Sequence, residues 1–188
     1  MEADKLVDDA TAALIRRCKN NDENAYNQLL SLYEGYLYRL CFNYTRNKEE
    51  ALDMIQEVYI KVFRSLHYFD ETRPFLPWLK KIAINTLINN SRKNRIDETP
   101  LQSESFLQDN TNTEDLVVSN DTRNIINNLI AELPESYRLA LTLRYYENLN
   151  YEEIASELEQ PLGTVKNSVH RARNILRKKM QACELLEV

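Results

Sequence analysis

Apolar residues recur at helical spacing along most of the chain, with polar residues between them. In the first half, this pattern predicts a helix capped by Asp8 or Asp9 and ending near Asn20, followed by helices at about 23–44, 48–66 and 74–93. Pro74 and Pro77 fall in the first turn of the fourth helix, where a missing N–H removes no helical hydrogen bond. The first half is therefore expected to be helical.

The third predicted helix has a wide apolar face and a charged face on opposite sides. We expect its buried face to consist of Ala51, Leu52, Ile55, Val58, Tyr59, Val62, Phe63 and Leu66. The opposite side carries Asp53, Glu57, Lys61 and Arg64. The plain interpretation of the charged side is a solvated surface with a Glu57–Lys61 ion pair at i, i+4 spacing.

In the second half, the pattern predicts a helix at about 121–132 and another that begins at Pro134. Two further helices, joined by a tight turn, are predicted between Tyr151 and Lys179. Asn150 and Glu153 have the spacing of a capping box before the shorter one, whose apolar stripe is Ile154, Ala155 and Leu158. Pro161 can open the longer one, where its missing N–H would have no partner.

The last predicted helix has a basic outer face, and Val165, Val169, Ala172 and Leu176 form its buried stripe. The residues outside that stripe are Thr164, Lys166, Asn167, His170, Arg171, Arg173 and Arg177. From Gln160 to Ala182 there are six Lys or Arg residues and no Asp or Glu. A short helix, a turn and a basic helix are the form of a helix-turn-helix DNA reader, whereas a solvated basic helix on an ordinary bundle is the plain alternative. Thr, Asn and His on the first turns favour DNA, because those side chains can address base edges.

Residues 96–122 differ in composition from both halves. They include seven acidic residues, no Lys or Arg, and no sustained helical period. We therefore predict an all-α protein with two small helical domains joined by a flexible acidic linker, at 1–95, 96–120 and 121–188.

Composition narrows the functional classes. The 188 residues carry a formal net charge of −5, but the basic residues are segregated, with five and no acid from Lys80 to Arg95. Cys18, Cys41 and Cys183 are far apart and form no CxxC pair, which predicts reduced thiols in a cytosolic protein and no zinc site. The N-terminus has no apolar signal-peptide core, and no stretch approaches the ~20 apolar residues of a membrane span, so no membrane insertion is expected.

The stretch from Leu133 to Lys179 resembles the promoter-binding C-terminal domain of a bacterial sigma factor. The matching features are Leu133-Pro134, Leu143 to Tyr146, Tyr151 to Ala155, Gly163 to Lys166, and Arg171 to Arg173. The chain departs from the usual family pattern at Asn167, where serine is more frequent, and in the turn at Glu159-Gln160, which lacks a glycine. The resemblance implies that the upstream promoter element is bound by Thr164, Lys166, Asn167, His170, Arg171 and Arg173.

Two segments of the first half resemble the same family. Asp53 to Tyr59 is similar to the helix that docks on the clamp coiled coil of core RNA polymerase, which implies that Asp53, Gln56 and Glu57 face the polymerase. Trp78 to Asn85 resembles the helix that, with the loop before it, contacts and opens the downstream promoter element, although Leu76-Pro77 stands where arginine is often found. This implies DNA-binding roles for His67, Tyr68, Lys80, Lys81, Asn85, Asn89 and Arg92.

The loop from His67 to Thr72 contains side chains suited to hold an unpaired base. A base taken out of the melted strand needs stacking surface and polar edges, and His67, Tyr68 and Phe69 supply such groups. For Phe69 alone, the simpler interpretation is that its ring closes the core beneath the loop.

The chain is identified by these resemblances as a member of the extracytoplasmic-function group of sigma factors. Membership implies that it binds core RNA polymerase and promoter DNA, and directs promoter recognition, promoter opening and transcription initiation. It also implies a cytoplasmic location and regulation by a membrane-linked anti-sigma factor. No cofactor and no enzymatic activity are expected, since the chemistry belongs to the polymerase.

Two other classes are compatible with parts of the sequence. A free-standing transcriptional regulator would use the same helix-turn-helix, bind its operator without polymerase and form a dimer, but it leaves Asp53–Tyr59 and Trp78–Asn85 unexplained. A metal-dependent nuclease would use the pairs Glu152 with Glu153, or Asp53 with Glu57. No His or third acid accompanies either pair at a fixed spacing, and retention of function in EDTA would exclude it.

Overall fold

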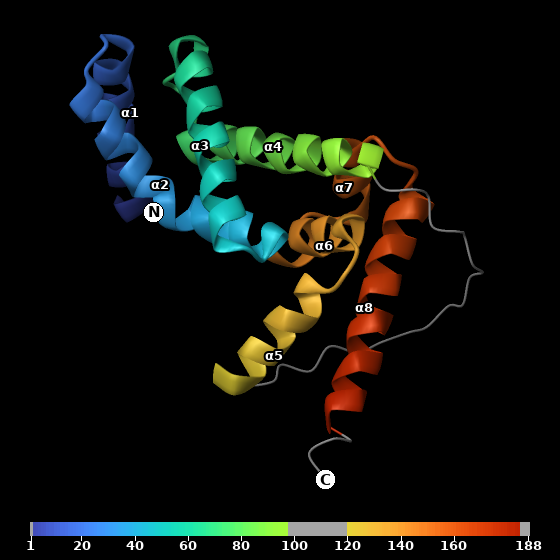
Figure 1. Cartoon of the computed structure of the whole chain (residues 1–188). Coiled ribbons are helices and arrows are strands. Elements are labelled where there is room, and N and C mark those ends of the chain that lie inside the picture. The colour runs from blue at the N-terminus through green and yellow to red at the C-terminus, as the bar shows by residue number, and fades with distance from the viewer. Residues whose placement is uncertain (1, 98–119, 185–188) are drawn as a thin grey trace. The chain divides into compact units, whose positions relative to one another are not determined.

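The computed structural model describes residues 2–97 and 120–184, and within that part of the chain every regular element is a helix (Figure 1). Two compact units are present, Met1–Asn89 and Asn90–Val188. The all-α prediction is therefore confirmed. Most of the predicted acidic linker, residues 98–119, lies outside the described residues, so the proposed domain limits and the linker remain predictions.

The first helix, α1, spans Glu2–Lys19 and begins earlier than its sequence pattern predicts. Asp8 and Asp9 lie inside the helix, so their prediction as N-terminal caps was wrong. The sequence from Glu2 to Val7 contains no Pro or Gly that would end a helix, so the helix can begin before either residue. The last turn carries Arg16, Arg17 and Lys19.

Helices α2 (Glu23–Thr45) and α3 (Lys48–Ser65) begin at side-chain caps. Asp22 accepts a hydrogen bond from the backbone N–H of Ala25, and Asn47 accepts from the N–H groups at the start of α3. Between these helices, Arg46 adopts a left-handed conformation with a φ of 58°, which ends α2 in a tight turn. A short 3-10 turn, η1 (Leu66–Tyr68), and a loop then lead into α4 (Phe75–Asp97).

The buried face of α3 is narrower than the sequence predicts. Leu52 and Phe63 are 41% and 65% exposed, so their prediction as core residues was wrong. Met54, which the prediction omitted, is buried. Burial follows a single stripe made of Ala51, Met54, Ile55, Val58 and Val62. At helical spacing these positions occupy an arc of about 100° around the helix axis, the typical width of the face that meets the core.

The second unit contains α5 (Asn120–Ala131), α6 (Glu135–Leu141), the π-helical turn η2 (Thr142–Tyr146), α7 (Tyr151–Leu158) and α8 (Leu162–Glu184). Its core includes Leu139, Leu143, Ile154, Val165, Val169 and Ala172. Leu176 is only half-buried, so the predicted stripe of α8 is fully buried over its first three members.

The described cysteines, Cys18 and Cys41, are free thiols, as predicted. Cys41 is fully buried, and burial raises the pKa of its thiol to about 12, which keeps it protonated and unreactive at neutral pH. The side chain of Cys183 lies outside the described residues.

Candidate functional site

Helices α7 and α8 form a helix-turn-helix whose turn is fixed by local backbone contacts. The capping box predicted at Asn150 and Glu153 is present: Asn150 Oδ1 accepts from the N–H of Glu153 at 2.8 Å, and Glu153 Oε2 accepts from the N–H of Asn150 at 2.7 Å. Glu159 ends α7 with a φ of 53°, without the glycine that favours this conformation. α8 begins one residue after Pro161, whose carbonyl accepts from the N–H of Thr164 at 2.9 Å.

The outer face of α8 presents the polar residues predicted to bind DNA. Thr164 and Lys166 are exposed, and the side chains of Asn167, His170, Arg171 and Arg173 are half-buried. Arg171 Nε donates to Asn167 Oδ1 at 3.2 Å, and His170 lies 2.8 Å from the amide nitrogen of Asn174. These side chains are therefore paired one helical turn apart, which restricts the rotamers that they present.

Tyr151, at the start of α7, contributes to this surface in a way that sequence reasoning missed. Its ring lies beneath the Arg144 guanidinium, 5.0 Å from the ring centroid, and Lys166 Nζ lies 6.0 Å from the same centroid. Arg144 also donates to the carbonyl of Leu149 at 2.9 Å. The tyrosine ring attracts both cations and so helps to position them. The alternation of aromatic and basic residues around the motif was the sequence signal that could have indicated this.

On α3, Asp53 and Gln56 are exposed and Glu57 is half-buried. The predicted Glu57–Lys61 ion pair is present, with 2.8 Å between Glu57 Oε1 and Lys61 Nζ. Lys61 Nζ also donates to Thr86 Oγ1 on α4 at 3.0 Å, and the Thr86 hydroxyl donates to the carbonyl of Ile82. Lys61 thus holds the Glu57 carboxylate in place and joins α3 to α4.

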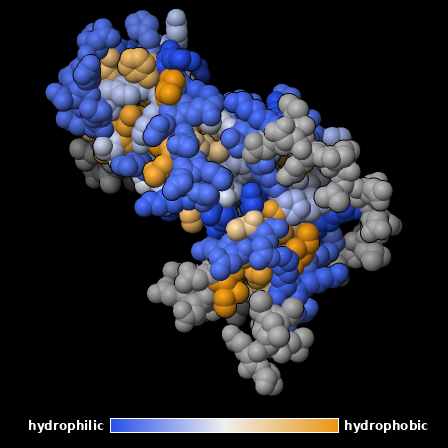
Figure 2. Space-filling model, viewed as in Figure 1, coloured by the Kyte–Doolittle hydropathy of each residue, from blue (hydrophilic) through white to orange (hydrophobic). Residues whose placement is uncertain are grey.

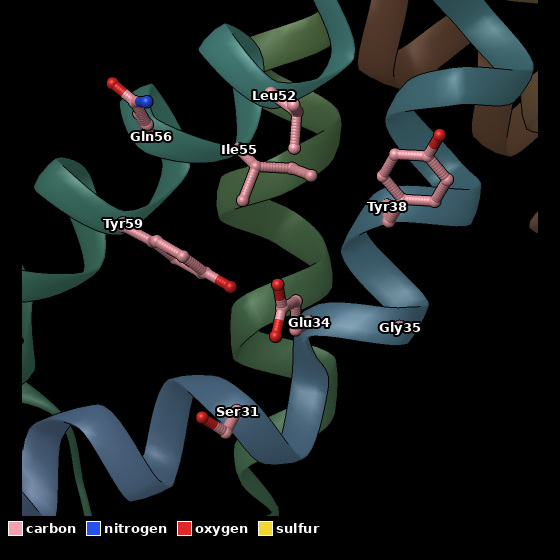
Figure 3. Close-up of a pocket in the computed structure, with 8 residues that line it drawn as sticks. All are labelled: Ser31, Glu34, Gly35, Tyr38, Leu52, Ile55, Gln56 and Tyr59. Carbon is pink, nitrogen blue, oxygen red and sulfur yellow. The ribbon is translucent and has the colours of Figure 1, made fainter. Parts of the chain in front are cut away.

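A pocket of about 500 Å³ lies between α2 and α3 beside these residues, and Figure 3 shows its lining. It is lined by Ser31, Glu34, Gly35, Tyr38, Leu52, Ile55, Gln56 and Tyr59. Tyr59 and Glu34 come from facing helices; burial, with a smaller contribution from the Glu34 carboxylate, raises the pKa of Tyr59 to about 12. This pocket was not predicted from the sequence, because it depends on the pairing of two helices.

The candidate DNA face of α4 is polar and accessible. Lys81, Asn85, Asn89 and Arg92 are exposed, as the helical spacing predicts. Lys80 is half-buried, with its Nζ 5.3 Å from the ring centroid of Tyr36 on α2. On the opposite side of α4, Leu79, Ala83 and Thr86 are buried, and Ile82 is half-buried.

The loop before α4 separates its aromatic residues into two groups. His67 and Tyr68 are exposed, Tyr68 by 87%, and their rings meet edge to face at 5.8 Å. Phe69 is buried, and its ring lies 5.5 Å from Phe75 and 4.9 Å from Trp78. The interpretation of Phe69 as a core residue is therefore confirmed, and it leaves His67 and Tyr68 as the accessible aromatic rings of the loop.

Hydrophilic residues cover most of the face shown in Figure 2, and hydrophobic residues form small separate groups. Over residues 2–97 and 120–184, no cluster of three or more His, Cys, Asp or Glu side chains has the arrangement of a metal site. Within the same residues, no helix is long and apolar enough to cross a membrane.

Two family models match the chain. Sigma-70 region 2 matches residues 29–96, which include α3 and the exposed face of α4. Sigma-70, region 4 matches residues 123–176, which include the helix-turn-helix.

Curated relatives match over nearly their whole length. The chain is 33% identical over 177 residues to the ECF RNA polymerase sigma factor SigW of Bacillus subtilis, covering 89% of this chain and 95% of the relative. It is 34% identical over 178 residues to the ECF RNA polymerase sigma-E factor of Escherichia coli, covering 89% and 93%.

Two solved structures share the fold. One is CnrH in complex with the cytosolic domain of CnrY, with a TM-score of 0.53, 18% identity and coverage of 92% of this chain and 98% of that one. The other is the sigma factor RpoE in complex with the anti-sigma factor NepR from Bartonella quintana, with a TM-score of 0.53, 22% identity and coverage of 83% and 96%.

Proposed function

Because the chain belongs to the ECF group of RNA polymerase sigma factors, it acts with RNA polymerase in promoter recognition and transcription initiation, and we propose which residues perform each step. The observation that carries the assignment is that three polar surfaces are accessible to solvent: the side of α3 with Asp53, Gln56 and Glu57, the outer side of α4 with its preceding loop, and the basic side of α8.

The polymerase-binding surface consists of Asp53, Gln56 and Glu57. Its support is the fixed position of the Glu57 carboxylate, which Lys61 holds at 2.8 Å. Gln56 also lines the neighbouring pocket, whose exposed Leu52 offers apolar contact area. A central apolar contact with charged groups around it is the usual composition of a specific protein interface.

The upstream promoter element is bound by the outer face of α8, through Thr164, Lys166, Asn167, His170, Arg171 and Arg173. The hydrogen bond from Arg171 to Asn167 holds the Asn167 amide in position. This supports a base-reading role for Asn167, whose amide would bind a base edge in the major groove. Arg173 and Lys166 then contact phosphates, which fixes the register of the helix without reading sequence.

The downstream element is bound and opened by α4 and the loop before it. His67 and Tyr68 receive an unpaired base, for which their exposed rings offer a stacking surface. The backbone of the strand is held by Lys80, Lys81, Asn85, Asn89 and Arg92.

The remaining assignments follow from the family. The chain is not itself an enzyme and is located in the cytoplasm with the polymerase. An anti-sigma factor regulates it, by analogy with the RpoE–NepR complex. The resemblance to the extracytoplasmic-function group, and not this complex, is the ground on which we propose that the regulator is linked to the membrane.

Substitution of Asp53→Arg together with Glu57→Arg tests the polymerase surface. Association with core polymerase should be abolished in co-purification, because two attractive charges become repulsive, while circular dichroism should show an unchanged helical content. Glu49→Arg with Glu50→Arg is the matched control, since it changes the charge of the same helix equally. Equal loss of association in both double variants would contradict the assignment of the polymerase contact to Asp53 and Glu57.

A further inference from the structure

The loop that follows η1 is attached to the end of α1 by one carboxylate. Glu71 Oε2 accepts a hydrogen bond from Arg16 Nε at 2.8 Å, and Glu71 Oε1 pairs with Lys19 Nζ at 3.0 Å. Both oxygens of Glu71 are therefore held by the last turn of α1, across 55 and 52 residues of sequence respectively.

Lys19 makes a second contact with the same loop. Its Nζ donates to the backbone carbonyl of Phe69 at 2.8 Å, so one ammonium group holds both a side chain and the main chain of the loop. The ring of Phe69 meanwhile packs on Phe75 and Trp78. The residue immediately after Tyr68 is thus fixed at its carbonyl from one side and at its ring from the other.

The rest of the loop is stiffened by Asp70. Its Oδ1 accepts from the N–H of Thr72 at 3.1 Å and from the Thr72 hydroxyl at 2.7 Å. The hydrogen bonds that Lys19 and Arg16 donate to Glu71 lower the pKa of that carboxyl below its ordinary value of 4.5, which agrees with an ionised, paired group at neutral pH.

We propose that the end of α1 belongs to the promoter-opening site, where Arg16, Lys19 and Glu71 form a clamp that holds the loop in the conformation that receives the unpaired base. The proposal rests on the function proposed above for His67 and Tyr68. The three clamp residues are positioning residues, because they act through the loop and do not touch the base.

Ordering of the loop before DNA arrives explains why such a clamp affects promoter opening. Arg16 is largely exposed, and exposed ion pairs add little to the stability of a fold, whereas the side chains of Lys19 and Glu71 are only 21% and 25% exposed and their pair contributes more. A loop that is ordered before DNA arrives, however, loses less conformational freedom when it captures a base. Loss of the clamp should therefore slow opening, and removal of Arg16 alone should leave the unfolding transition nearly unchanged.

Trp78 provides a readout of the clamp that does not involve polymerase. It is the single tryptophan of the chain, and its ring packs on Phe69, whose carbonyl Lys19 holds. We expect Lys19→Met and Glu71→Gln to increase acrylamide quenching of Trp78 fluorescence in the free protein. Arg17→Met is the matched control, since Arg17 lies on the same turn but pairs with Asp22 at 2.8 Å.

The functional test is open-complex formation on a duplex promoter, followed by permanganate reactivity of unpaired thymines. With core binding unchanged, Lys19→Met and Glu71→Gln should slow opening about two- to tenfold, the effect expected when one or two side chains must be ordered during capture. Lys19→Arg keeps the charge and the donors, so it should restore most of the rate. Arg17→Met should open promoters normally.

Replacement of His67 to Thr72 by a Gly/Ser segment of equal length separates this inference from the proposed function. If that replacement opens duplex promoters at the normal rate, the loop has no role in melting and the proposed function of His67 and Tyr68 fails. If the replacement slows opening but Lys19→Met and Glu71→Gln behave like Arg17→Met, the loop functions without the clamp and the inference is overturned. Unchanged Trp78 quenching in both clamp variants would also overturn it.

Discussion

The loop before α4 and the turn between α7 and α8 both lie next to a proposed DNA-reading helix, but they are held in different ways. The loop depends on α1 through Glu71 and on the aromatic core through Phe69. The turn depends on its own neighbours: Glu159 adopts a left-handed conformation, and the N–H groups of Gln160 and Thr164 donate to the carbonyls of Ala155 and Pro161. One segment is positioned by contacts distant in sequence, and the other by contacts within a few residues.

This difference has a functional meaning. A reader of duplex DNA needs only a rigid helix at a fixed angle, and local contacts are sufficient to provide it. A segment that receives a base from a melted strand has to present separate rings in a defined arrangement, although its regular structure is limited to the short 3-10 turn η1. Contacts from a second element, here α1, can provide that arrangement.

The largest expected effect comes from removing the anchor that the loop shares with the core. Phe69→Ala should destabilise the first unit by about 3–5 kcal/mol, because it leaves a cavity among Phe75 and Trp78. Urea unfolding followed by Trp78 fluorescence measures this, since the single tryptophan reports on that unit. Phe69→Leu is the control that keeps most of the apolar volume. A loss below about 1 kcal/mol in Phe69→Ala would show that the ring contributes little to the core.

An intermediate effect is expected in the helix-turn-helix, whose turn is held by local contacts, for substitutions on α8. Asn167→Ala should cost roughly 1–3 kcal/mol of binding free energy at one base position of the upstream element. Arg173→Ala should weaken all promoters alike and reduce the salt slope of binding by about one unit, as loss of one phosphate contact does. Promoter variants titrated with holoenzyme at several salt concentrations separate the two behaviours. Equal effects of Asn167→Ala on every base variant would contradict the base-reading role.

The smallest effect is a pH dependence confined to the clamp. Because the folded-state pKa of Glu71 lies below its ordinary 4.5, the contribution of the clamp is complete above about that pH and is lost as the pH falls through the lower value. Trp78 quenching in the wild type should therefore rise over this acidic range while circular dichroism still reports a folded chain. Glu71→Gln should show a smaller rise, due to the neighbouring Asp70, whose pKa is lowered by its hydrogen bonds to Thr72. Identical titrations would exclude Glu71 as the titrating group.

The same contrast explains which features the sequence could predict. The capping box, the limits of α2 and α3, and the exposed faces of α4 and α8 follow from residues within one or two turns of each other, and all were predicted closely. The polar face of a helix can be identified without knowing what packs against its other side. For this reason the candidate DNA-binding residues could be named from spacing and a family resemblance.

Features that depend on pairing between distant elements were missed. Leu52 and Phe63 fit an apolar period, yet they lie off the stripe that meets the core, and only the packing of α3 determines which apolar positions are covered. The clamp was missed for the same reason, since Arg16, Lys19 and Glu71 are ordinary charged residues in sequence. The early start of α1 was missed because two adjacent acids are equally suited to a cap and to the first turns of a longer helix.

The separation of 55 positions between Arg16 and Glu71 also determines the order of events during synthesis. At about 5–20 residues per second, α1 is made about 3–11 s before the carboxylate that its last turn binds. Within that interval the ribosome synthesises Asp53, Gln56 and Glu57. The loop can be fixed only later, after Phe75 and Trp78, on which the Phe69 ring packs, have been added. On the ribosome, the residues of α3 that we propose to contact the polymerase are therefore synthesised first, and the loop proposed to hold melted DNA is among the last parts of its unit to take shape.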